Sequence, residues 1–578
     1  MIKNSEIFKI ISFIKNFIKP IWSLIKESNL SKVKILLVLV LTVLPSFFEA
    51  LFILLLAPFT NSIFNSADVK SSNLNLISQT FNSPFLLLLL IIFVLFAKSS
   101  IATFSSYYLT RIRFIIRKNL RIKLIDTDLE SSWISKLEGG KLLDAYLSSS
   151  TNASKTLFYF SEFLTYSFYV FAILLTLIIR VSLDLIIVFI LIGIIYYVVI
   201  YFLSKRSRYL SFANLVTNQK LSQLAVEVFR GAREIQIYGF KNTLLNNMRN
   251  EEEKVVENES KHSLLQKIPS ILPSILITLL VIYGFFSRGE NEISSSSNII
   301  VTSLVAIQRL GIYLSIIGNK LTMIGAGTAE INLLLKQINN KISEKGIQLK
   351  LSKDSRNYIS IENLTFNYGN KKELLKNIDL TISSGKVTVI TGPSGSGKSS
   401  LFSLILKEYN PIAGDIKINK IPLNKISKTN WYSYLSTVSQ TPFMFNTSIL
   451  NNIKIGKSDA SLYKVIKASK ASRALEYINK LNNKFEFNVS ADGRNLSGGY
   501  CQLIALTRVI LKDSPIILLD EPSNNLDSKS INNLKVLLTS WANKNKLVLV
   551  ITHDQRLIDK SFDVYNLEDS NLIIKERI

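Results

Sequence analysis

Apolar residues gather in the part of this 578-residue chain that precedes Lys320, rather than being spread evenly along it. Six apolar stretches there are long enough to cross a hydrocarbon core of ~30 Å, which takes about 20 helical residues. They cover residues 35–59, 85–109, 157–179, 183–203, 268–287 and 298–318. The third and fourth stretches meet at Arg180 to Asp184, so a tight helical hairpin is expected there. The pattern predicts an all-α membrane domain of six helices over residues 34–325.

The connections between these stretches differ in length and charge. Residues 110–156 and 204–267 are long, rich in Lys and Arg, and patterned as helices. The other three connections, 60–84, 180–182 and 288–297, hold only Lys70, Arg180 and Arg288 as basic residues. Because basic loops stay on the cytoplasmic side, this asymmetry places both termini in the cytoplasm.

The first 33 residues have the pattern of an amphipathic helix. Ile7, Ile11, Ile14 and Ile18 recur at helical spacing and are interrupted by lysines. Such a stripe suits a helix that lies along the membrane surface. No A-x-A cleavage pattern follows, so a cleaved signal peptide is not expected.

A different pattern begins beyond the last apolar stretch. Residues 326–357 continue a polar helical pattern that ends in Ser, Lys and Asp, as expected of a linker. From residue 358 to 578, strand-like runs alternate with helical segments, the pattern of a parallel sheet flanked by helices. These runs are Val387–Thr391, Ile516–Leu519 and Leu547–Thr552. The fold class is therefore a six-helix transmembrane domain followed by an α/β domain.

Composition and charge narrow the partners. The net charge is +26, but Lys and Arg are scattered through a chain that is 48% hydrophobic and 19% charged, so a nucleic-acid partner is not expected. The excess of basic residues fits an AT-rich coding bias and basic cytoplasmic loops. A single cysteine, Cys501, excludes an internal disulfide framework.

The strongest chemical motif is Gly392 to Ser399, with the sequence GPSGSGKS, which matches G-x-x-x-x-G-K-[ST] between a predicted strand and an apolar helix. In such a loop, backbone N–H groups and the helix N-terminus hold phosphates, the lysine meets the terminal phosphates, and the Ser/Thr hydroxyl ligates Mg²⁺. The lysine is Lys398 and the hydroxyl is that of Ser399. The predicted ATP-binding residues of this loop are Gly392, Pro393, Ser394, Gly395, Ser396, Gly397, Lys398, Ser399 and Ser400.

Two carboxylates follow the apolar run Ile516–Leu519. If that run is a buried strand of the same sheet, Asp520 and Glu521 lie at its carboxyl edge, near the phosphate loop. Asp520 would then hold the Mg²⁺ shell, and Glu521 would polarise the water that attacks the phosphate. An apolar run followed by Asp-Glu is common, so this pair alone does not establish the site.

Between the two motifs lies Leu496-Ser497-Gly498-Gly499-Tyr500, which resembles the LSGGQ signature of ABC-type ATPases. With it, residues 358–578 resemble an ABC nucleotide-binding domain in the order and spacing of their motifs. The resemblance implies that residues 496–500 contact ATP, that Tyr368 stacks on adenine, and that Gln440 senses the γ-phosphate and ligates the metal. It also implies that Asp527 closes the loop joining two sites and that His553 is the switch histidine. The catalytic set is then Glu521, His553, Lys398 and Gln440.

The resemblance is incomplete at three places: Tyr500 replaces the usual Gln, Leu503 replaces a usual Arg, and Asn524-Asn525 replaces the commoner Ser-Ala. Ser497, Gly498 and Gly499 match the family. Because Glu521 and His553 are also present, a hydrolytically competent site is expected, and the effect of the replacements on rate stays open.

In this family ATP lies between the phosphate loop of one subunit and the signature of the other, so a dimer is implied. A homodimer suffices, and a heterodimer with a related chain stays open. Candidate short helices that would transmit the motion are Ser131–Leu137 and Val228–Tyr238. The order of the domains, membrane part first, resembles bacterial ABC exporters more than importers.

The substrate is the least determined feature. Ionisable residues inside apolar stretches usually face a cavity or a partner. Of these, Glu49 and Arg309 lie deep and are candidate substrate residues, whereas the pattern favours positions near the membrane interface for Lys98 and Glu162. The first stretch and Gln308-Arg309-Leu310 loosely resemble bacterial exporters that flip lipid-linked oligosaccharides.

The resemblance therefore implies an exporter of a lipid or lipid-linked glycan in a bacterial cytoplasmic membrane, in contact with membrane lipid and using ATP and Mg²⁺. Export of peptides or hydrophobic small molecules is the alternative. A regulated channel, a non-transporting ATPase and a soluble nucleic-acid ATPase are readings from other classes. Intact Glu521 and His553 disfavour the channel and the non-transporting ATPase.

Overall fold

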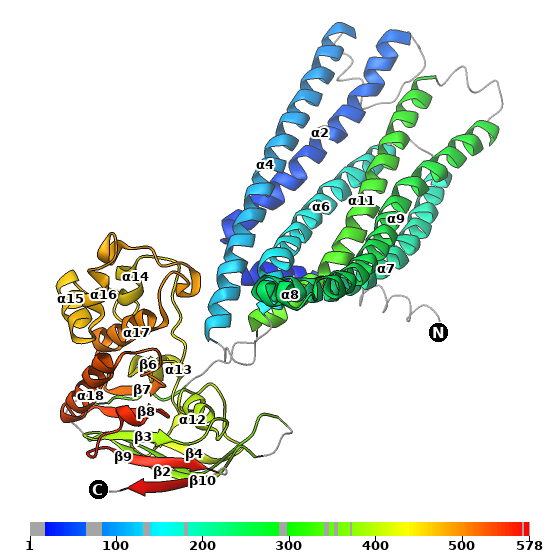
Figure 1. Ribbon diagram of the computed structural model, residues 1–578. Helices are drawn as coiled ribbons and strands as arrows, with labels where there is room; N and C mark the ends of the chain where they lie inside the picture. The colour runs from blue at the N-terminus through cyan, green and yellow to red at the C-terminus, as the bar shows by residue number, and fades with distance from the viewer. Residues whose placement is uncertain are drawn as a thin grey trace. The chain divides into compact units, whose positions relative to one another are not determined.

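A computed structural model of the chain forms two compact units, one helical and one α/β, each described here by itself (Figure 1). The helical unit comprises Met1–Ser131 and Lys136–Lys341, and the soluble unit comprises Ser132–Ser135 and Ile342–Ile578. The structure describes residues 18–64, 84–130, 139–178, 183–287, 297–339, 346–351, 356–369, 373–568 and 571–576. Ile7, Ile11, Ile14 and the candidate helix Ser131–Leu137 lie outside the described residues.

Long helices, several of them side by side in Figure 1, build the helical unit. They are α2 (Lys32–Phe64), α4 (Pro84–Glu130), α6 (Ser150–Ile178), α7 (Leu183–Arg230), α9 (Lys241–Ser287) and α11 (Ser297–Asn339). Short segments join them: α5 (Gly139–Asp144), the π-helical η2 (Ala145–Ser149) and α8 (Ala232–Ile237). Each of the six predicted apolar stretches lies along a different long helix. Because α4, α7 and α9 also run far into the charged connections, the helical character predicted for those connections is confirmed.

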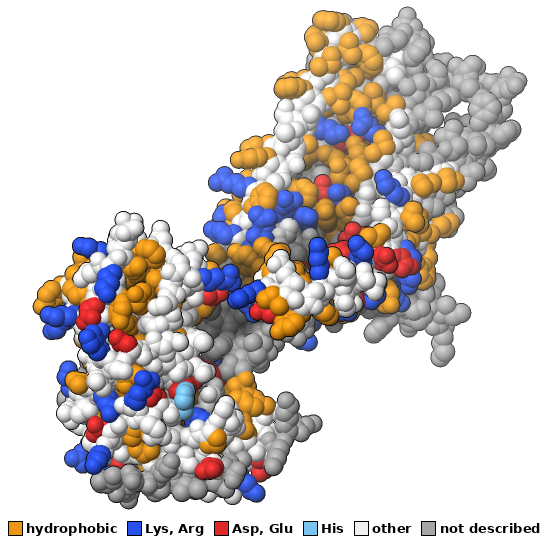
Figure 2. Space-filling model, viewed as in Figure 1, with side chains coloured by type: hydrophobic (Ala, Val, Ile, Leu, Met, Phe, Trp, Pro, Cys, Tyr) orange, Lys and Arg blue, Asp and Glu red, His pale blue; other side chains and the backbone are white. Residues whose placement is uncertain are grey.

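Three helical segments of the described chain are long and apolar enough to cross a membrane: Lys32–Thr60, Pro84–Thr127 and Leu142–Thr176. Large apolar side chains such as Phe47, Phe85, Phe93 and Phe96 are exposed on α2 and α4. Figure 2 shows orange side chains over the ends of α2 and α4 that lie far from α8, and blue Lys and Arg side chains nearer α8. An apolar band bordered by basic residues is the surface expected of a membrane domain.

The described part of the N-terminal segment packs onto this unit. Residues 18–27 are helical, and Ile21 and Leu24 are fully buried in a cluster with Ile112, Ile116 and Leu120 of α4. Ile18, the residue of the predicted apolar stripe that lies within the described residues, is 47% exposed, whereas Ile21 and Leu24 further along the same helix contact protein.

Two sheets form the soluble unit. The antiparallel sheet has the order β2-β1-β4-β5, and the larger sheet has the order β10-β9-β3-β8-β7-β6. In the larger sheet, β9, β3, β8, β7 and β6 run parallel, and β10 is antiparallel to β9. The strands are β1 (Tyr358–Phe366), β2 (Leu375–Ser383), β3 (Val387–Thr391), β4 (Ala413–Ile418), β5 (Ile421–Pro422), β6 (Leu435–Val438), β7 (Ile516–Asp520), β8 (Leu547–Ile551), β9 (Asp563–Glu568) and β10 (Asn571–Glu576).

Helices cover this sheet and continue into a helical region. The α-helices are α12 (Lys398–Ile405), α13 (Lys428–Ser433), α14 (Ile449–Lys454), α15 (Leu462–Ala471), α16 (Ala474–Ile478), α17 (Gly498–Lys512) and α18 (Ser528–Asn543). The 3-10 turns are η3 (Leu423–Lys425), η4 (Lys484–Glu486), η5 (Ala491–Gly493) and η6 (Gln555–Leu557).

The central strands are apolar throughout because both faces of the sheet are covered. Ile517 and Leu519 of β7 point into one hydrophobic cluster, and Ile516 and Leu518 point into the other. This alternation explains why β7 reads as an unbroken apolar run that ends abruptly in two acids. The soluble fold also takes in residues ahead of the start expected at 358, since Leu349 is buried and its N–H donates to Asn430.

Candidate functional site

The phosphate loop joins β3 to α12 in a conformation that depends on glycine. Gly392 has φ 147°, and a Cβ atom there would lie 2.3 Å from the carbonyl oxygen of Leu567. Gly397, the residue that caps α12, has φ 101°. L side chains rarely adopt either of these φ values. The loop can therefore direct its N–H groups to an anion site at the N-terminus of α12 only because these positions are glycine.

Lys398 folds back over this loop. Its Nζ donates to the carbonyl oxygens of Gly392 at 2.9 Å and Pro393 at 2.6 Å, and lies 3.4 Å from Ser396 Oγ. These acceptors are neutral. An anion bound at the loop can therefore replace them as partners of the ammonium by breaking hydrogen bonds and no ion pair with them. The neighbouring Ser399 is exposed, while Ser400 is buried.

Four adjacent strands of the larger sheet bring the predicted residues to one edge. The phosphate loop follows β3, and Thr552 and His553 follow β8. Asp520 ends β7 and Glu521 follows it, and Gln440 comes two residues after β6. Since β3, β8, β7 and β6 are consecutive and parallel, all these segments leave the same carboxyl edge. Residues from four distant parts of the sequence thus share one site.

Glu521 is the best-anchored acid at this edge. Its side chain is buried, its Oε1 lies 2.8 Å from Nδ1 of His553, and its Oε2 lies 3.4 Å from both the hydroxyl of Thr552 and the backbone N–H of His553. The φ of Glu521 is 49°, an uncommon value for a non-glycine residue and typical of functional sites. The His553 side chain itself is 67% exposed, so it can meet a ligand while it contacts Glu521.

Asp520 has a different electrostatic environment. Burial raises its pKa to about 6, with a further contribution from the neighbouring Glu521, and Lys398 opposes the rise. A half-buried carboxylate at a strand end and an exposed serine hydroxyl offer the oxygen donors that Mg²⁺ prefers. The residues predicted to hold Mg²⁺, Ser399, Gln440 and Asp520, therefore have suitable chemistry. Gln440 is exposed at the end of its strand.

Tyr368 belongs to an aromatic group beside the loop. Its ring packs edge-on against Phe366 at 4.9 Å and Tyr409 at 5.2 Å, and its hydroxyl shares a hydrogen bond of 2.9 Å with Ser400. This arrangement holds the ring next to the phosphate loop with 41% of the residue exposed. Tyr409 and Phe366 support the ring, and no motif in the sequence pointed to them.

The signature residues begin helix α17. Ser497 is the N-cap residue, is exposed, and accepts a hydrogen bond from the N–H of Tyr500. The two glycines are required by Asn525: a Cβ atom at Gly498 would lie 2.8 Å from its Nδ2, and one at Gly499 would lie 2.6 Å from its carbonyl oxygen. Among the described residues, the hydrogen bonds of the signature do not reach the phosphate loop of the same chain.

The residues that depart from the family pattern make defined contacts. The ring of Tyr500 packs on Tyr477 at 4.5 Å, and Leu503 is buried in the core beneath α17. Asn525 has φ 61° and supplies the contacts to Gly498 and Gly499. Asp527 caps α18 by accepting a hydrogen bond from the N–H of Ser530, and hydrogen bonding with the side chain and then the backbone of Ser530 lowers the pKa of that carboxyl.

A second cluster of charges lies in the helical unit, and we call Glu49, Lys98, Arg309 and Tyr313 the Glu49 cluster. Glu49 of α2 is 0% exposed and forms an ion pair with Lys98 of α4. Its other oxygen accepts a hydrogen bond of 2.6 Å from Tyr313 and lies 4.0 Å from Nε of Arg309, both on α11. The sequence favoured an interfacial position for Lys98, but the structure places its ammonium against Glu49.

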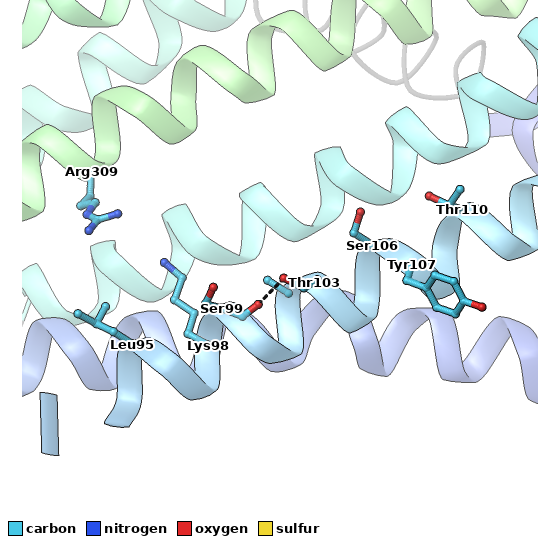
Figure 3. Close-up of a pocket in the computed structure, with 9 residues that line it drawn as sticks. Leu95, Lys98, Ser99, Thr103, Ser106, Tyr107, Thr110 and Arg309 are labelled. Atoms are coloured by element: carbon cyan, nitrogen blue, oxygen red, sulfur yellow. Dashed lines mark hydrogen bonds between the residues drawn. The ribbon is translucent and has the colours of Figure 1, made fainter. Parts of the chain in front are cut away.

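Lys98 and Arg309 also line a pocket of about 790 Å³ along α4 (Figure 3). The two predicted substrate residues, Glu49 and Arg309, are thus brought together, with Lys98 and Tyr313 as partners that sequence reasoning missed. A polar face on α4 could have revealed Lys98, since Ser99, Thr103, Ser106 and Thr110 follow it at helical spacing. Glu162 lies elsewhere and pairs with Lys320 at 2.7 Å.

Comparison with known families decides the assignment. Residues 35–313 match the family described as ABC transporter transmembrane region, and residues 375–524 match the family described as ABC transporter. The chain belongs to the ABC transporters. The two matches together take in about three quarters of the chain, with the transmembrane and ATP-binding parts fused in the order expected from the sequence. The family resemblance drawn from residues 496–500 is confirmed.

Two relatives show how far the similarity extends. An ABC transporter ATP-binding/permease protein of Haemophilus influenzae is 27% identical over 361 residues, 61% of this chain and 64% of that protein. An ATP-dependent lipid A-core flippase of Pasteurella multocida is 28% identical over 414 residues, 70% of each chain. The chain therefore spans somewhat less than two thirds of the first relative's length.

A solved structure shares the fold. The structure described as a bacterial Atm1-family ABC exporter with ATP bound superposes with a TM-score of 0.82 over 94% of this chain and 95% of that chain, at 17% identity. At this identity the likeness concerns the fold alone. The predicted fold class, a helical transmembrane domain fused to an α/β ATPase domain, is confirmed.

Proposed function

We propose that this ABC transporter chain is one half of an ATP-hydrolysing exporter, which pairs with a second copy of itself and moves an amphiphilic lipid or lipid-linked glycan. The observation that carries the ATPase part is the shared edge of β3, β8, β7 and β6, where the phosphate loop, His553, Asp520, Glu521 and Gln440 lie in strand order. A heterodimer with a related chain is the alternative assembly.

Each residue at this edge takes a role set by its position. Lys398 and the backbone N–H groups of residues 394–400 bind the β- and γ-phosphates. The carboxylate of Glu521 accepts the proton of the attacking water, and His553, 2.8 Å from it, holds it in place and faces the γ-phosphate. Ser399, Asp520 and Gln440 would hold Mg²⁺, which when bound neutralises phosphate charge. Tyr368 offers its ring to the adenine.

The second copy supplies what one chain lacks. Ser497, Gly498 and Gly499 lie at the exposed N-terminus of α17, where the helix dipole and free N–H groups favour a phosphate. Because their hydrogen bonds within the described residues do not join them to their own phosphate loop, we infer that they complete the partner's site. Leu496, Tyr500 and Asp527 flank that junction.

The membrane part would carry the substrate while the ATPase part opens and closes. The segment Val228–Tyr238, which includes α8, is the described candidate for transmitting the motion, and its Phe229 and Tyr238 are each 81% exposed. Basic residues on the long connections support cytoplasmic termini in a bacterial inner membrane. The flippase name of the Pasteurella multocida relative and the charges of the Glu49 cluster support a lipid or lipid-linked glycan.

Reconstitution into liposomes tests the proposal. The purified full chain is inserted with fluorescent phospholipid or lipid-linked sugar, and ATP-dependent translocation is measured by quenching from outside. The matched control is Glu521→Gln, which we expect to bind ATP but to lose hydrolysis by roughly 10²–10⁴-fold and to lose translocation.

Three outcomes would overturn parts of the proposal. Unchanged hydrolysis in Glu521→Gln refutes the base. Hydrolysis without movement of any lipid, combined with uptake of peptides or dyes, moves the assignment to the peptide or small-molecule exporters. Recovery of the protein from cells in a salt-washed soluble fraction refutes the membrane domain.

A further inference from the structure

We propose that the Glu49 cluster binds the singly charged phosphodiester head of an anionic lipid, and that Glu49 is the internal counter-ion that sets the charge of this site. The inference rests on the proposed export of an amphiphile and names the chemistry of its head group. Its basis is the placement of Lys98 and Arg309 at the wall of a pocket, with Glu49 buried behind them.

The charges of the cluster do not cancel. Glu49 carries one negative charge and faces two cations, so one positive charge is in excess. Glu49 is 0% exposed, whereas Lys98 is 15% exposed and Arg309 is 35% exposed. The carboxylate is thus hidden and the cations are reachable. Because an excess positive charge is expensive within an apolar stretch, and both cations are only partly exposed, an anion in the pocket would stabilise the cluster.

Aromatic rings hold the two cations in place without cancelling their charge. Lys98 Nζ lies 5.2 Å from the centre of the Tyr169 ring, and the guanidinium of Arg309 lies 5.6 Å from the centre of the Phe52 ring. Ring faces attract cations without taking up their hydrogen-bond donors. The ammonium of Lys98 donates to Glu49 and to the hydroxyl of Tyr313 at 3.3 Å, which leaves its third N–H for an anion. In Figure 3, Lys98 extends from α4 toward α11, and Arg309 extends from α11 toward α4.

Hydroxyl groups extend the pocket away from the cations. Ser99, Thr103, Ser106, Tyr107 and Thr110 line it along one side of α4. Ser99, Thr103, Ser106 and Thr110 are spaced three to four residues apart, which puts them on one helix face, and Tyr107 adjoins that face. A row of hydroxyls next to a cationic end fits a phosphate that is esterified to a polyol, such as glycerol or a sugar. A phosphodiester has one negative charge, which equals the excess of the cluster.

The surroundings favour a lipid over a soluble phosphate ester. The pocket lies largely along residues 85–109, an apolar stretch predicted to cross the membrane. Phe93, Phe96 and Phe104 are exposed on the same stretch of α4 and can meet acyl chains. The occupant is therefore expected to have an anionic hydroxylated head and an apolar tail.

A charge series tests the role of Glu49. The full chain is placed in nanodiscs of neutral phosphatidylcholine with increasing phosphatidylglycerol, and stimulation of ATP hydrolysis is measured. Lys98→Met reduces the excess to zero, and we expect the half-stimulating fraction of phosphatidylglycerol to rise about 10-fold. Glu49→Gln raises the excess, so half-stimulation comes at a lower fraction and preference moves toward doubly charged phosphatidic acid.

The double variant Lys98→Met/Glu49→Gln restores the excess of one, and it should respond to phosphatidylglycerol within about 3-fold of the wild type. The matched controls are Lys320→Met and Glu162→Gln, which break an ion pair outside the pocket lining and should not shift the response. The opposite shift expected in Glu49→Gln, toward a lower fraction of phosphatidylglycerol, separates the charge effect from a folding defect, because a folding defect would not make the protein respond to less lipid.

Three results would overturn the inference. Equal shifts in Lys98→Met and Lys320→Met indicate a general effect of membrane charge. Failure of the double variant to recover, with its thermal stability restored, removes Glu49 as the counter-ion. Equal stimulation by soluble glycerol phosphate assigns the site to a free phosphate ester. In all three cases wild-type lipid translocation still stands, so a failure of the proposed function, in which no lipid moves, is distinguishable.

Discussion

Two lysines of this transporter, one in each unit, differ in the partners that an anion would have to replace or share. Lys398, in the phosphate loop, donates to neutral oxygens of Gly392, Pro393 and Ser396. Lys98, in the helical unit, is paired with the full negative charge of buried Glu49. A nucleotide therefore replaces weak partners at Lys398, whereas a ligand of Lys98 must share it with a carboxylate. The phosphate loop can therefore bind an anion with high affinity, whereas the affinity of the Glu49 cluster for an anion depends on the net charge of the cluster.

The largest expected effect concerns the lysine of the phosphate loop. Replacing Lys398 by Ala removes the ammonium from the terminal phosphates, and ATP hydrolysis should fall by at least ~100-fold. Phosphate release from the full chain in nanodiscs measures it. The matched control is Lys386→Ala, since Lys386 is exposed and pairs with Asp563 at 3.2 Å. If both variants lose activity equally, Lys398 has no special role.

The second prediction concerns the stability of the helical unit. Lys98→Met leaves Glu49 as a buried charge without its ion-pair partner, and breaking such a pair costs about 3–5 kcal/mol. The Tm of the purified protein should fall by several degrees and recover in Lys98→Met/Glu49→Gln. Lys320→Met should cost less, because its partner Glu162 is 26% exposed. An equal loss in the two lysine variants would contradict the buried character of Glu49.

The same two lysines show which features of the two sites could be predicted from the sequence. Lys398 was predicted because its motif is local: strand, glycines, lysine and helix follow one another. The strand ends that carry Asp520, Glu521 and His553 could be predicted because parallel strands expose their carboxyl ends on one edge. Glu49 and Arg309 could be predicted because they are charged residues within apolar stretches. The contacts of Tyr313 and Lys98 with Glu49 could not be predicted, because they depend on how α2, α4 and α11 pack.

The third prediction concerns the signature glycines. A Cβ atom at Gly499 would meet the backbone oxygen of Asn525 at 2.6 Å, whereas one at Gly498 would meet its side chain. Both alanine variants should lower ATP hydrolysis, about 10-fold, because the signature is displaced. Asn525→Gly should rescue Gly498→Ala and should not rescue Gly499→Ala. Rescue of both, or of neither, would show that the contact with Asn525 is not the cause.

The smallest expected effect depends on pH and concerns Glu330 of α11. Burial raises its pKa from the ordinary 4.5 to about 7, with Asp144 adding to the rise and Asn152 and Lys155 opposing it. The folded protein thus binds more protons than the unfolded chain, and stability falls as pH rises from 4.5 through 7. Glu330→Gln should raise Tm by about 2 °C at pH above 7 and have little effect near pH 4.5. A rise that is independent of pH would contradict this assignment.

An ATP site shared between two copies underlies the proposed function, and mixed dimers test it directly. One copy carries Lys398→Ala and the other carries Ser497→Arg, with different affinity tags so that only mixed dimers are purified. A shared site leaves one of the two sites intact, and ATP hydrolysis should return to about half of the wild-type rate, or less if the sites are coupled. The control dimer carries both changes on one copy and none on the other, and it should be inactive. Activity in the control dimer, together with an inactive mixed dimer, would contradict the shared site and place each ATP within a single chain.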